Sequence, residues 1–314
     1  MNNRKLTIII PVYNEEESLR PLYEEIMQNI PTLDGLIGSY ELLFVDDGSK
    51  DGSVEVIKEL AKEDPNVHAI IFRKNFGKAE ALQAAFRTAM GDIIITMDAD
   101  LQDDPMELKN FIEKLDEGYD LVSGWKYNRL DPLEKRLPSK LFNKVTCKMS
   151  GIHLHDFNCG FKAYRKEVVK SIDIYGEYHR YIPVLAHRKG FKIAEIKVHH
   201  NKRQFGKSKY GFERYLRGLF DSMSSSFLLR YYDRPMYFFG KNGLICCLLG
   251  GISTMTQVIS KILKKDKNIH TGLFLGVYLL GLGFLSFMMG FLGNMIVDSS
   301  YRDSYTEAHV KERF

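Results

Sequence analysis

Four aspartates follow an apolar run in the segment DIIITMDADLQDDP, residues 92–105. The β-branched residues of the run favour a buried strand. Asp103 and Asp104 suit the cap of a helix that begins directly after them. Asp98 and Asp100 need another explanation, because alternate residues of a strand point to the same side. Two carboxylates at the end of a strand suit Mg²⁺ or Mn²⁺, which prefer oxygen ligands, and a solvated acidic turn is the alternative.

The elements that must position these carboxylates alternate between strands and helices over residues 6–125. Strands are expected at 6–12, 41–45, 67–72, 92–97, 120–123 and 191–199, and helices at 16–29, 53–63, 78–90 and 105–117. This alternation predicts a mostly parallel sheet with helices on both faces, and such sheets bind ligands beyond the carboxyl ends of their strands. The polar clusters fall there: Tyr13, Asn14 and Glu15 after the first strand, Asp46 and Asp47 after the second, and Asp98 and Asp100 after the fourth.

The first strand-to-helix turn reads PVYNEEES and contains no glycine. A dinucleotide-binding turn needs glycine so that a pyrophosphate can approach the backbone, which argues against that class. Any phosphate bound at this edge of the sheet must therefore be neutralised by a metal or by basic side chains.

Charge is unevenly spread along the 314 residues, whose net charge is +4. Acidic residues dominate 13–120, and Lys and Arg crowd 126–234, which points to an anionic partner such as a phosphate ligand or a membrane surface. No nucleic-acid-binding motif is present, so nucleic acid is not expected. The four cysteines form no C-x-x-C pair, and the set Cys147, His153, His155 and Cys159 matches no familiar zinc spacing.

The last third of the chain changes character. Residues 211–232 alternate basic and aromatic groups at helical spacing, which suits a helix in a membrane interface or an amphipathic helix packed on a core. Residues 236–259 are mostly apolar, and 272–297 carry no charge over 26 residues, enough to cross a bilayer. The basic residues that flank this pair outnumber the four lysines between its helices, so both ends of the hairpin are expected in the cytosol.

Six segments, in this order along the chain, carry a family resemblance. The segments PVYNEEES, FVDDGSKDGS, NFGKAEALQAAF and MDADLQDDP, followed by FNCGFKAYRKEVV and RQFGKSKYGFERYLRGLFD, resemble glycosyltransferase family 2. With the two-helix tail, the chain is most similar to the polyprenyl-phosphate glycosyltransferases over residues 6–297. The chain departs from the family pattern at two places. LQDDPM replaces the common LQDPPE. Lys126 stands where relatives often have arginine, and lysine keeps the positive charge but cannot form arginine's bidentate hydrogen bonds with phosphate.

The resemblance implies an α/β fold of the nucleotide-diphospho-sugar transferase type, Rossmann-like and mostly parallel, followed by an amphipathic interface helix and a transmembrane hairpin. The expected division is a cytosolic catalytic domain at 1–210, the interface helix at 211–233, two transmembrane helices within 234–298 (about 236–259 and 272–297), and a cytosolic tail at 299–314. The expected location is the bacterial inner membrane. The sequence is also compatible with a homo-oligomer.

The resemblance also assigns residue roles. Nucleotide-sugar binding is expected of Pro11, Tyr13, Glu15, Asp46, Asp47, Lys78, Asp98, Ala99, Asp100, Gln102, Lys126, Arg203 and Lys209. Asp98, Asp100 and Gln102 would hold the metal; Lys135, Arg136, Ser139 and Ser208 would bind the acceptor phosphate; and Asp100, Arg203 and Lys209 would be catalytic. Some of these residues have a purely structural role as the alternative. Glu15 would begin a helix, one of Asp46 and Asp47 would form a turn, and Lys78 would be a first-turn helix residue. Residues 203–209 would be a linker.

The activity that these features imply is an inverting, metal-dependent transfer of a sugar from a UDP- or GDP-sugar to a membrane polyprenyl phosphate, in the synthesis of a cell-envelope glycan. Mg²⁺ or Mn²⁺ is the expected cofactor. One alternative is a membrane-tethered glycosyltransferase that acts on a glycan or glycolipid hydroxyl, which would need a general base. Another is an inactive nucleotide-sugar-binding anchor.

Overall fold

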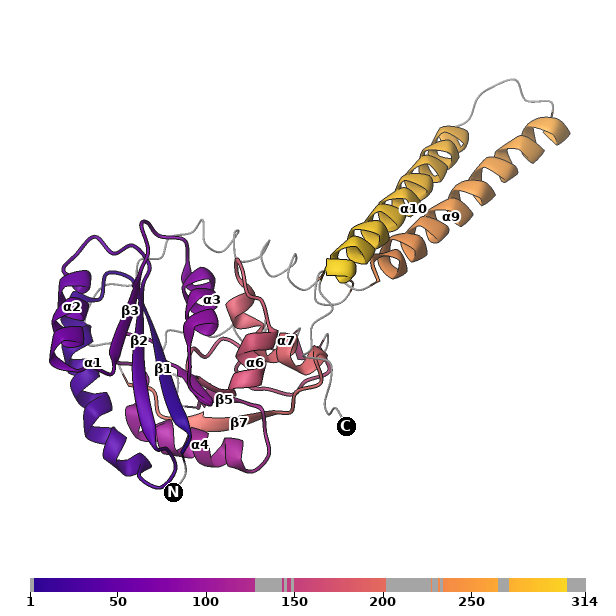
Figure 1. Cartoon of the computed structure of the whole chain (residues 1–314). Coiled ribbons are helices and arrows are strands. Elements are labelled where there is room, and N and C mark those ends of the chain that lie inside the picture. Colours follow the sequence, from indigo (N-terminus) through magenta and orange to yellow (C-terminus); the bar gives the residue numbers. More distant parts are fainter. Residues whose placement is uncertain are drawn as a thin grey trace. The chain divides into compact units, whose positions relative to one another are not determined.

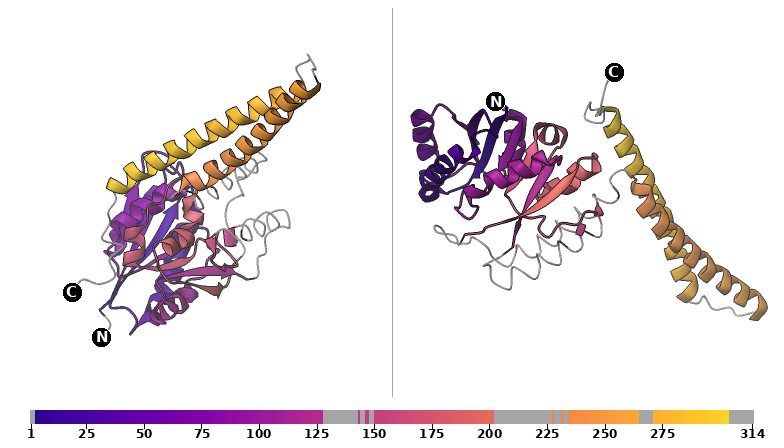
Figure 2. Two further views of the ribbon diagram at one scale, coloured as in Figure 1. Left: turned by 90° about the vertical axis from the view of Figure 1, so that its right-hand side faces the viewer. Right: turned by 90° about the horizontal axis from the view of Figure 1, so that it is seen from below.

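The computed structural model describes residues 3–127, 150–201, 234–264 and 271–303, with the single positions 143, 146, 147, 227 and 231. The chain divides into two compact units. The first contains the α/β elements and the second contains two long helices, α9 and α10 (Figures 1 and 2). The predicted amphipathic segment 211–233 lies outside the described residues apart from Phe227 and Tyr231.

The first unit is built on a sheet whose strand order is β3-β2-β1-β4-β6-β5-β7. Its strands are β1 (Lys5–Val12), β2 (Ser39–Asp46), β3 (Val67–Ile71), β4 (Ile93–Thr96), β5 (Leu121–Lys126), β6 (Lys162–Arg165) and β7 (Ile193–Val198). Strands β1, β2, β3 and β4 pair in parallel with one another, and β5 pairs in parallel with β7, while β6 is antiparallel to both β4 and β5. The prediction of a mostly parallel sheet is therefore confirmed.

Helices cover both faces of the sheet (Figure 1). They are α1 (Glu16–Asn29), α2 (Ser53–Glu63), α3 (Lys78–Thr88), α4 (Leu108–Asp116), α6 (Lys166–Ser171) and α7 (Ile182–Arg188), with 3-10 turns η1 (Ile30–Leu33), η2 (Pro105–Glu107) and η3 (Tyr178–Arg180). Alternate residues of β1, from Leu6 to Val12, join the apolar residues of α1, α2 and α4 in one core cluster. Helix α3 packs against β1 and β2 and also contacts α6, which forms the second layer.

Four elements depart from the sequence-based expectation. Strand β6 and the short helices α6 and α7 were not predicted. The helix expected at 105–117 begins instead with η2, where the Asp104 carboxylate accepts the N–H of Met106 at 3.0 Å, and α4 follows from Leu108. This cap explains Asp104 as a local structural residue, separate from Asp98 and Asp100.

The second unit is an antiparallel pair of apolar helices, α9 (Pro235–Lys264) and α10 (Thr271–Asp303). Both are long and apolar enough to cross a membrane, and they contain the expected spans 236–259 and 272–297. Glycines allow their backbones to approach closely: a Cβ added to Gly250 would lie 2.8 Å from the Gly276 carbonyl, and one added to Gly283 would lie 2.8 Å from the Gly243 carbonyl. Such small-residue contacts are typical of helix pairs in lipid, where apolar burial gives no driving force between helices.

A buried carboxylate ties the amino-terminal edge of the sheet together. Glu41 on β2 is 3% exposed, forms an ion pair with Lys5 at 2.5 Å, and accepts hydrogen bonds from Thr7 Oγ1 at 2.6 Å and the Met90 N–H at 3.0 Å. Burial alone would raise the pKa of Glu41, but the Lys5 ammonium and the two donors outweigh it and leave the pKa below its ordinary value. The network therefore joins β1, β2 and the start of β4 through one charged group.

Glu41→Gln should lower the free energy of unfolding by about 2 kcal/mol, because it removes the charge that Lys5 and two hydrogen-bond donors share. Since the folded pKa of Glu41 is depressed, its contribution is present above the unfolded pKa and is lost as pH falls through the folded pKa. Thermal unfolding of the full chain at neutral and acidic pH measures both effects. The exposed Glu59, which pairs with Arg20, is the control, and Glu59→Gln should cost less than about 0.5 kcal/mol. Equal losses for the two variants would contradict the assignment.

Candidate functional site

The turns after β1 and β2 hold each other in place at the carboxyl edge of the sheet. Asn14 adopts a left-handed conformation (φ 53°), its side-chain oxygen accepts the Lys50 N–H at 2.7 Å, and its own N–H donates to Ser49 Oγ at 2.9 Å. The Glu15 N–H donates to Ser53 Oγ at 3.0 Å. These bonds explain why the turn contains short polar side chains, and they leave Tyr13 37% exposed at the rim of the site.

The two aspartates after β2 have different surroundings. Asp47 accepts the N–H groups of Phe76 and Gly77 at 2.7 and 2.9 Å and the Asn75 side-chain amide at 2.9 Å. Burial raises the pKa of the Asp47 carboxyl against the opposing effect of the two N–H donors. Asp46 accepts the Ser49 N–H through Oδ1 at 3.0 Å, while its Oδ2 is buried with no hydrogen-bond partner among the described residues. Asp47 therefore shapes the loop before α3, and Asp46 keeps an unused acceptor.

Asp98 follows β4 and is held on three sides. Its N–H donates to Asp103 Oδ2 at 3.0 Å, and its carboxylate forms an ion pair with the Lys78 ammonium at the start of α3. On its third side lies Gly160, where an added Cβ would meet the two carboxylate oxygens of Asp98 at 2.6 and 2.7 Å. The Gly160 carbonyl is itself fixed by Thr96 Oγ1 at 2.7 Å. The position of the Asp98 carboxylate is thus set by backbone packing as well as by charge.

Three lysines from different elements surround Asp98. Lys78 begins α3, Lys126 ends β5, and Lys162 begins β6. Burial alone would raise the pKa of Asp98, but Lys78 and then Lys126 outweigh it, and the pKa stays well below its ordinary value. Asp98 is therefore a carboxylate at every physiological pH, in a strongly positive setting.

Lys126 and Lys162 are both held by the protein. The Lys126 ammonium lies 3.3 Å from Oδ1 of Asp103, whose side chain is fully buried. Burial alone would lower the pKa of Lys126, and the Asp103 carboxylate reverses this and raises it. Lys162 is 2% exposed and donates to the Cys159 carbonyl, and burial lowers its pKa. Lys162 was not expected from the sequence, because a lysine in FKAYR has no visible partner.

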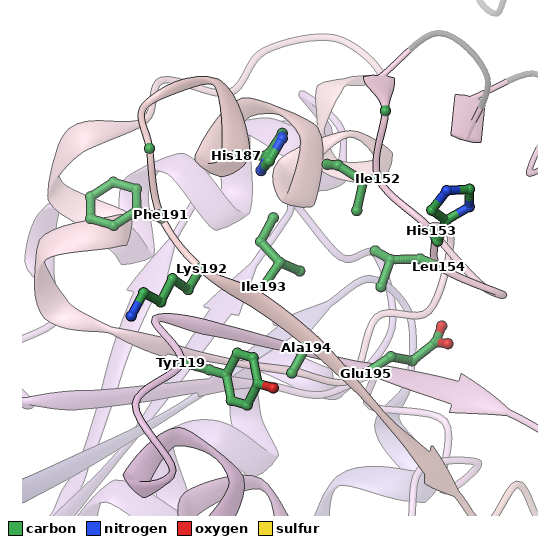
Figure 3. A pocket seen from close by; sticks show the side chains of 12 residues that line it. Tyr119, Ile152, His153, Leu154, His187, Phe191, Lys192, Ile193, Ala194 and Glu195 are labelled. Atoms are coloured by element: carbon green, nitrogen blue, oxygen red, sulfur yellow. The ribbon is translucent and has the colours of Figure 1, made fainter.

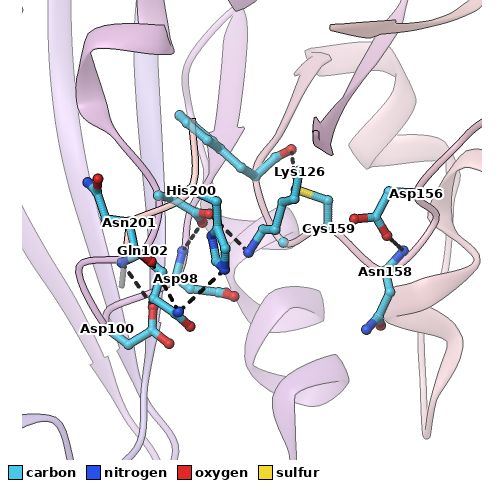
Figure 4. A network of polar contacts seen from close by, with 12 residues as sticks. Asp98, Asp100, Gln102, Lys126, Asp156, Asn158, Cys159, His200 and Asn201 are labelled. Carbon is cyan, nitrogen blue, oxygen red and sulfur yellow. Dashed lines mark hydrogen bonds and ion pairs between the residues drawn. The ribbon is translucent and has the colours of Figure 1, made fainter. Parts of the chain in front are cut away.

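The turn after Asp98 brings Asp100, Gln102 and His200 together (Figure 4). The Gln102 N–H donates to Asp100 Oδ1 at 3.3 Å, and the Gln102 side-chain amide lies 3.4 Å from His200 Nε2 and 3.3 Å from the Asn201 carbonyl. His200 also pairs through its backbone with Asp103. The sequence alone does not link His200 to Gln102, because the two residues are 98 positions apart in the chain.

Segment 177–180 packs against the helix that begins with Lys78, because η3 contacts α3. Glu177 and Arg180 form an ion pair at 3.1 Å. Burial, together with the charges of Lys78 and Arg180, lowers the pKa of His179 to about 3. His179 is therefore a neutral imidazole at physiological pH and adds no charge to the site.

The donor atoms fit a hard divalent cation. Asp98 and Asp100 would supply carboxylate oxygens to such a cation, and Gln102 would supply an amide oxygen. In the part of the chain that the structure describes, no group of three or more His, Cys, Asp or Glu could hold a metal. Mg²⁺ is usually held by one or two carboxylates together with substrate phosphates and water, so this donor set suits a cation that a phosphate ligand completes. The zinc alternative has no such support.

The cysteines and histidines considered as zinc ligands have other contacts. Cys147 Sγ contacts the Leu154 carbonyl at 3.3 Å, and His155 stacks on Trp125 with ring centroids 3.9 Å apart and bonds Glu195 at 2.7 Å. Cys159 is buried, and burial raises its pKa to about 12, which keeps it a thiol. These four residues do not converge.

Other predicted residues are placed as follows. Pro11 lies in β1 opposite Val45, and Ala99 is buried between the two carboxylates. Lys135, Arg136, Ser139, Arg203, Ser208 and Lys209 lie outside the described residues, so their roles stay predictions.

A separate hollow of about 520 Å³ lies at the amino ends of β5 and β7 and is lined by Tyr119, His187 and Phe191 among others (Figure 3). It is at the opposite ends of these strands from Lys126.

Comparison with known proteins places this site in a family. The model for glycosyl transferase family 2 matches residues 7–173. The chain is 34% identical to a dodecaprenyl-phosphate galacturonate synthase of Rhizobium johnstonii over 98% of this chain and 91% of that protein. It is 41% identical to an undecaprenyl-phosphate 4-deoxy-4-formamido-L-arabinose transferase of Shewanella sediminis over 70% of this chain and 66% of that one.

The fold is shared with a solved structure from Mycobacterium tuberculosis. That protein is a glucosyl-3-phosphoglycerate synthase in complex with Mn²⁺, uridine diphosphate and phosphoglyceric acid. The TM-score is 0.52 at 22% identity, over 72% of this chain and 78% of that one. At 22% identity, this structural similarity is evidence for the fold of the present chain alone.

Lys126→Met should lower the free energy of unfolding by about 3 kcal/mol, because it leaves the buried Asp103 carboxylate without its cation. Chemical unfolding of the full chain measures the loss. Lys109→Met, which removes an exposed partner of Glu113, is the matched control and should cost about 0.5 kcal/mol or less. If both variants were as stable as the wild type, Lys126 would not be holding Asp103, and ligand binding would be its main role.

Proposed function

Because the chain belongs to glycosyl transferase family 2, we propose that it transfers one sugar from a nucleotide sugar to a membrane polyprenyl phosphate. The observation that carries the proposal is the pair of carboxylates Asp98 and Asp100 at the end of a buried strand, surrounded by Lys78, Lys126 and Lys162. A site of this kind suits a diphosphate that binds with a metal. The names of the Rhizobium and Shewanella relatives supply the acceptor class.

The donor is a UDP- or GDP-sugar whose diphosphate lies toward Asp98 and Asp100. The buried Asp46 Oδ2 and the exposed ring of Tyr13 are the groups of the β1–β2 edge that can meet the nucleoside. Mg²⁺ or Mn²⁺, bound by Asp98, Asp100 and Gln102, would neutralise the nucleoside diphosphate as it leaves the sugar. The lysines would then balance the remaining negative charge of the diphosphate.

The transfer is a single displacement with inversion at the anomeric carbon. The second pKa of a phosphate monoester is about 6, so the acceptor is already a dianion at neutral pH and needs no general base. It does need cations to approach an anionic donor. Arg203 and Lys209 would supply them over the diphosphate, and Lys135, Arg136, Ser139 and Ser208 would hold the acceptor phosphate.

Attachment to the membrane follows from the second unit. Helices α9 and α10 would span the bilayer, with residues 211–233 along its surface and the catalytic domain 1–210 and the tail 299–314 in the cytosol. The acceptor lipid and the catalytic site would then share one membrane surface. Support comes from the apolar length of the two helices and from the lipid acceptors in the names of the relatives.

The test is incubation of the full chain with polyprenyl phosphate, Mn²⁺ and a panel of UDP- and GDP-sugars, with mass spectrometry of the lipid. A hexosyl- or pentosyl-phosphoryl lipid is expected from one donor. Asp100→Asn should slow its formation by about a hundredfold or more, because one charged ligand of the metal is lost. Asp104→Asn, in the same acidic segment but bonded to Met106, is the matched control and should keep the activity. Undiminished transfer in excess chelator would contradict the metal requirement.

The pH dependence should follow the acceptor. The rate is expected to rise as pH increases through about 6 and then to level off, because the phosphate monoester loses its second proton there. Initial rates between pH 5 and 8.5 at saturating donor measure this. A different profile, with transfer lost in Asp156→Asn or Glu177→Gln, would indicate a general base and therefore a hydroxyl acceptor.

A further inference from the structure

The ammonium of Lys78 lies on Asp98 Oδ1, an oxygen that a divalent cation would also need. We propose that Lys78 is an exchangeable counter-ion: it neutralises Asp98 in the ligand-free enzyme and transfers to the nucleotide diphosphate when a metal takes its place. The exchange makes metal and nucleotide diphosphate bind with positive coupling. The inference rests on the proposed nucleotide-sugar site and concerns the order in which that site fills.

The backbone of Lys78 is fixed from the nucleotide side of the site. Asp47 holds the three preceding residues through Asn75, Phe76 and Gly77, and Gly77 adopts φ +103°, a conformation that glycine tolerates best. Lys78 is therefore always the first residue of α3, placed by the end of β2. Its side chain reaches from there to Asp98 at the end of β4, so it links the two halves of the site.

Of the two partners, Lys78 is the one that can move. The Asp98 carboxylate lies against the Gly160 backbone, and the N–H of Asp98 is bound to Asp103. The Lys78 side chain is 34% exposed, and a lysine ammonium sits on a flexible four-carbon stem. A cation that binds Asp98 Oδ1 must therefore displace the lysine from that oxygen.

The neighbouring lysines cannot make the same exchange. Lys126 is paired with the fully buried Asp103, and its side chain is 11% exposed. Lys162 is 2% exposed and donates to the Cys159 carbonyl. Among the described cations that surround Asp98, Lys78 alone combines an ion pair to the Asp98 carboxylate with a partly exposed side chain.

Charge then determines the coupling. A divalent cation and an ammonium on one carboxylate repel each other, so a metal arriving alone must separate Lys78 from its partner without replacement. When a diphosphate is present, the displaced ammonium gains an anionic partner of its own. The metal should therefore bind weakly alone and more tightly with the nucleotide, and by linkage the nucleotide gains equally from the metal.

The test measures Mn²⁺ binding to the purified full chain by electron paramagnetic resonance of free Mn²⁺, alone and with UDP or GDP. In Lys78→Met, Mn²⁺ alone should bind about tenfold tighter than in the wild type, and the gain from nucleotide should fall by about the same factor, within the usual range of such coupling. Lys78→Arg keeps the charge and should keep the weak binding of Mn²⁺ alone. Lys74→Met is the control, because Lys74 lies in the same loop but contacts the Phe76 ring.

Three results would count against the exchange. Equal affinities of the wild type and Lys78→Met for Mn²⁺ alone would overturn it while leaving the proposed function intact. The same tightening in Lys74→Met would show a general effect of net charge and would also overturn it. Mn²⁺ binding to the wild type that neither nucleotide strengthens would overturn the proposed function together with the exchange. Circular dichroism of each variant verifies the fold, which should persist because the Lys78–Asp98 pair is partly exposed.

Discussion

The carboxylate of Asp98 is the group around which the rest of the site is arranged. A charge at the end of a buried strand is costly unless cations or hydrogen-bond donors surround it. Here Lys78 pairs with it, Lys126 and Lys162 add positive charge nearby, and Asp103 holds its backbone. These lysines come from a helix and two strands, so the fold itself must bring them together. The same arrangement fixes the position of the Asp98 carboxylate, to which a cation can bind.

The antiparallel strand β6 is what completes this arrangement. By entering between β4 and β5 it places Lys162 opposite Thr96 and Ser123 and brings the backbone of Gly160 against Asp98. A parallel strand at this position would require a further crossover and would arrive from the other edge of the sheet. The antiparallel direction of β6 thus places Gly160 and the buried Lys162 together at the carboxyl edge of the sheet. A side chain larger than glycine at position 160 would displace the carboxylate.

Much of this could be predicted from local patterns. The apolar runs of β1, β2 and β4 and the amphipathic helices α1, α2 and α3 have clear periodicity, and the D-x-D after a buried strand indicated the end of the sheet where the candidate site lies. Strand β6 was missed because it has four residues and begins with a lysine, so neither alternation nor apolar content marks it. The pairing of Lys78 with Asp98, and the approach of His200 to Gln102, depend on how strands are ordered in the sheet. No local pattern encodes that order.

The central claim is that Asp98 exchanges a lysine for a metal when the nucleotide binds. A crystal or cryo-electron microscopy structure of the full chain with Mn²⁺ and UDP or GDP tests it most directly. The account predicts a metal ion on Asp98 and Asp100, with the Lys78 ammonium moved from Asp98 onto a diphosphate oxygen and the Asp47–Gly77 contacts unchanged. A structure in which Lys78 still pairs with Asp98 while the metal and diphosphate are bound elsewhere would contradict it.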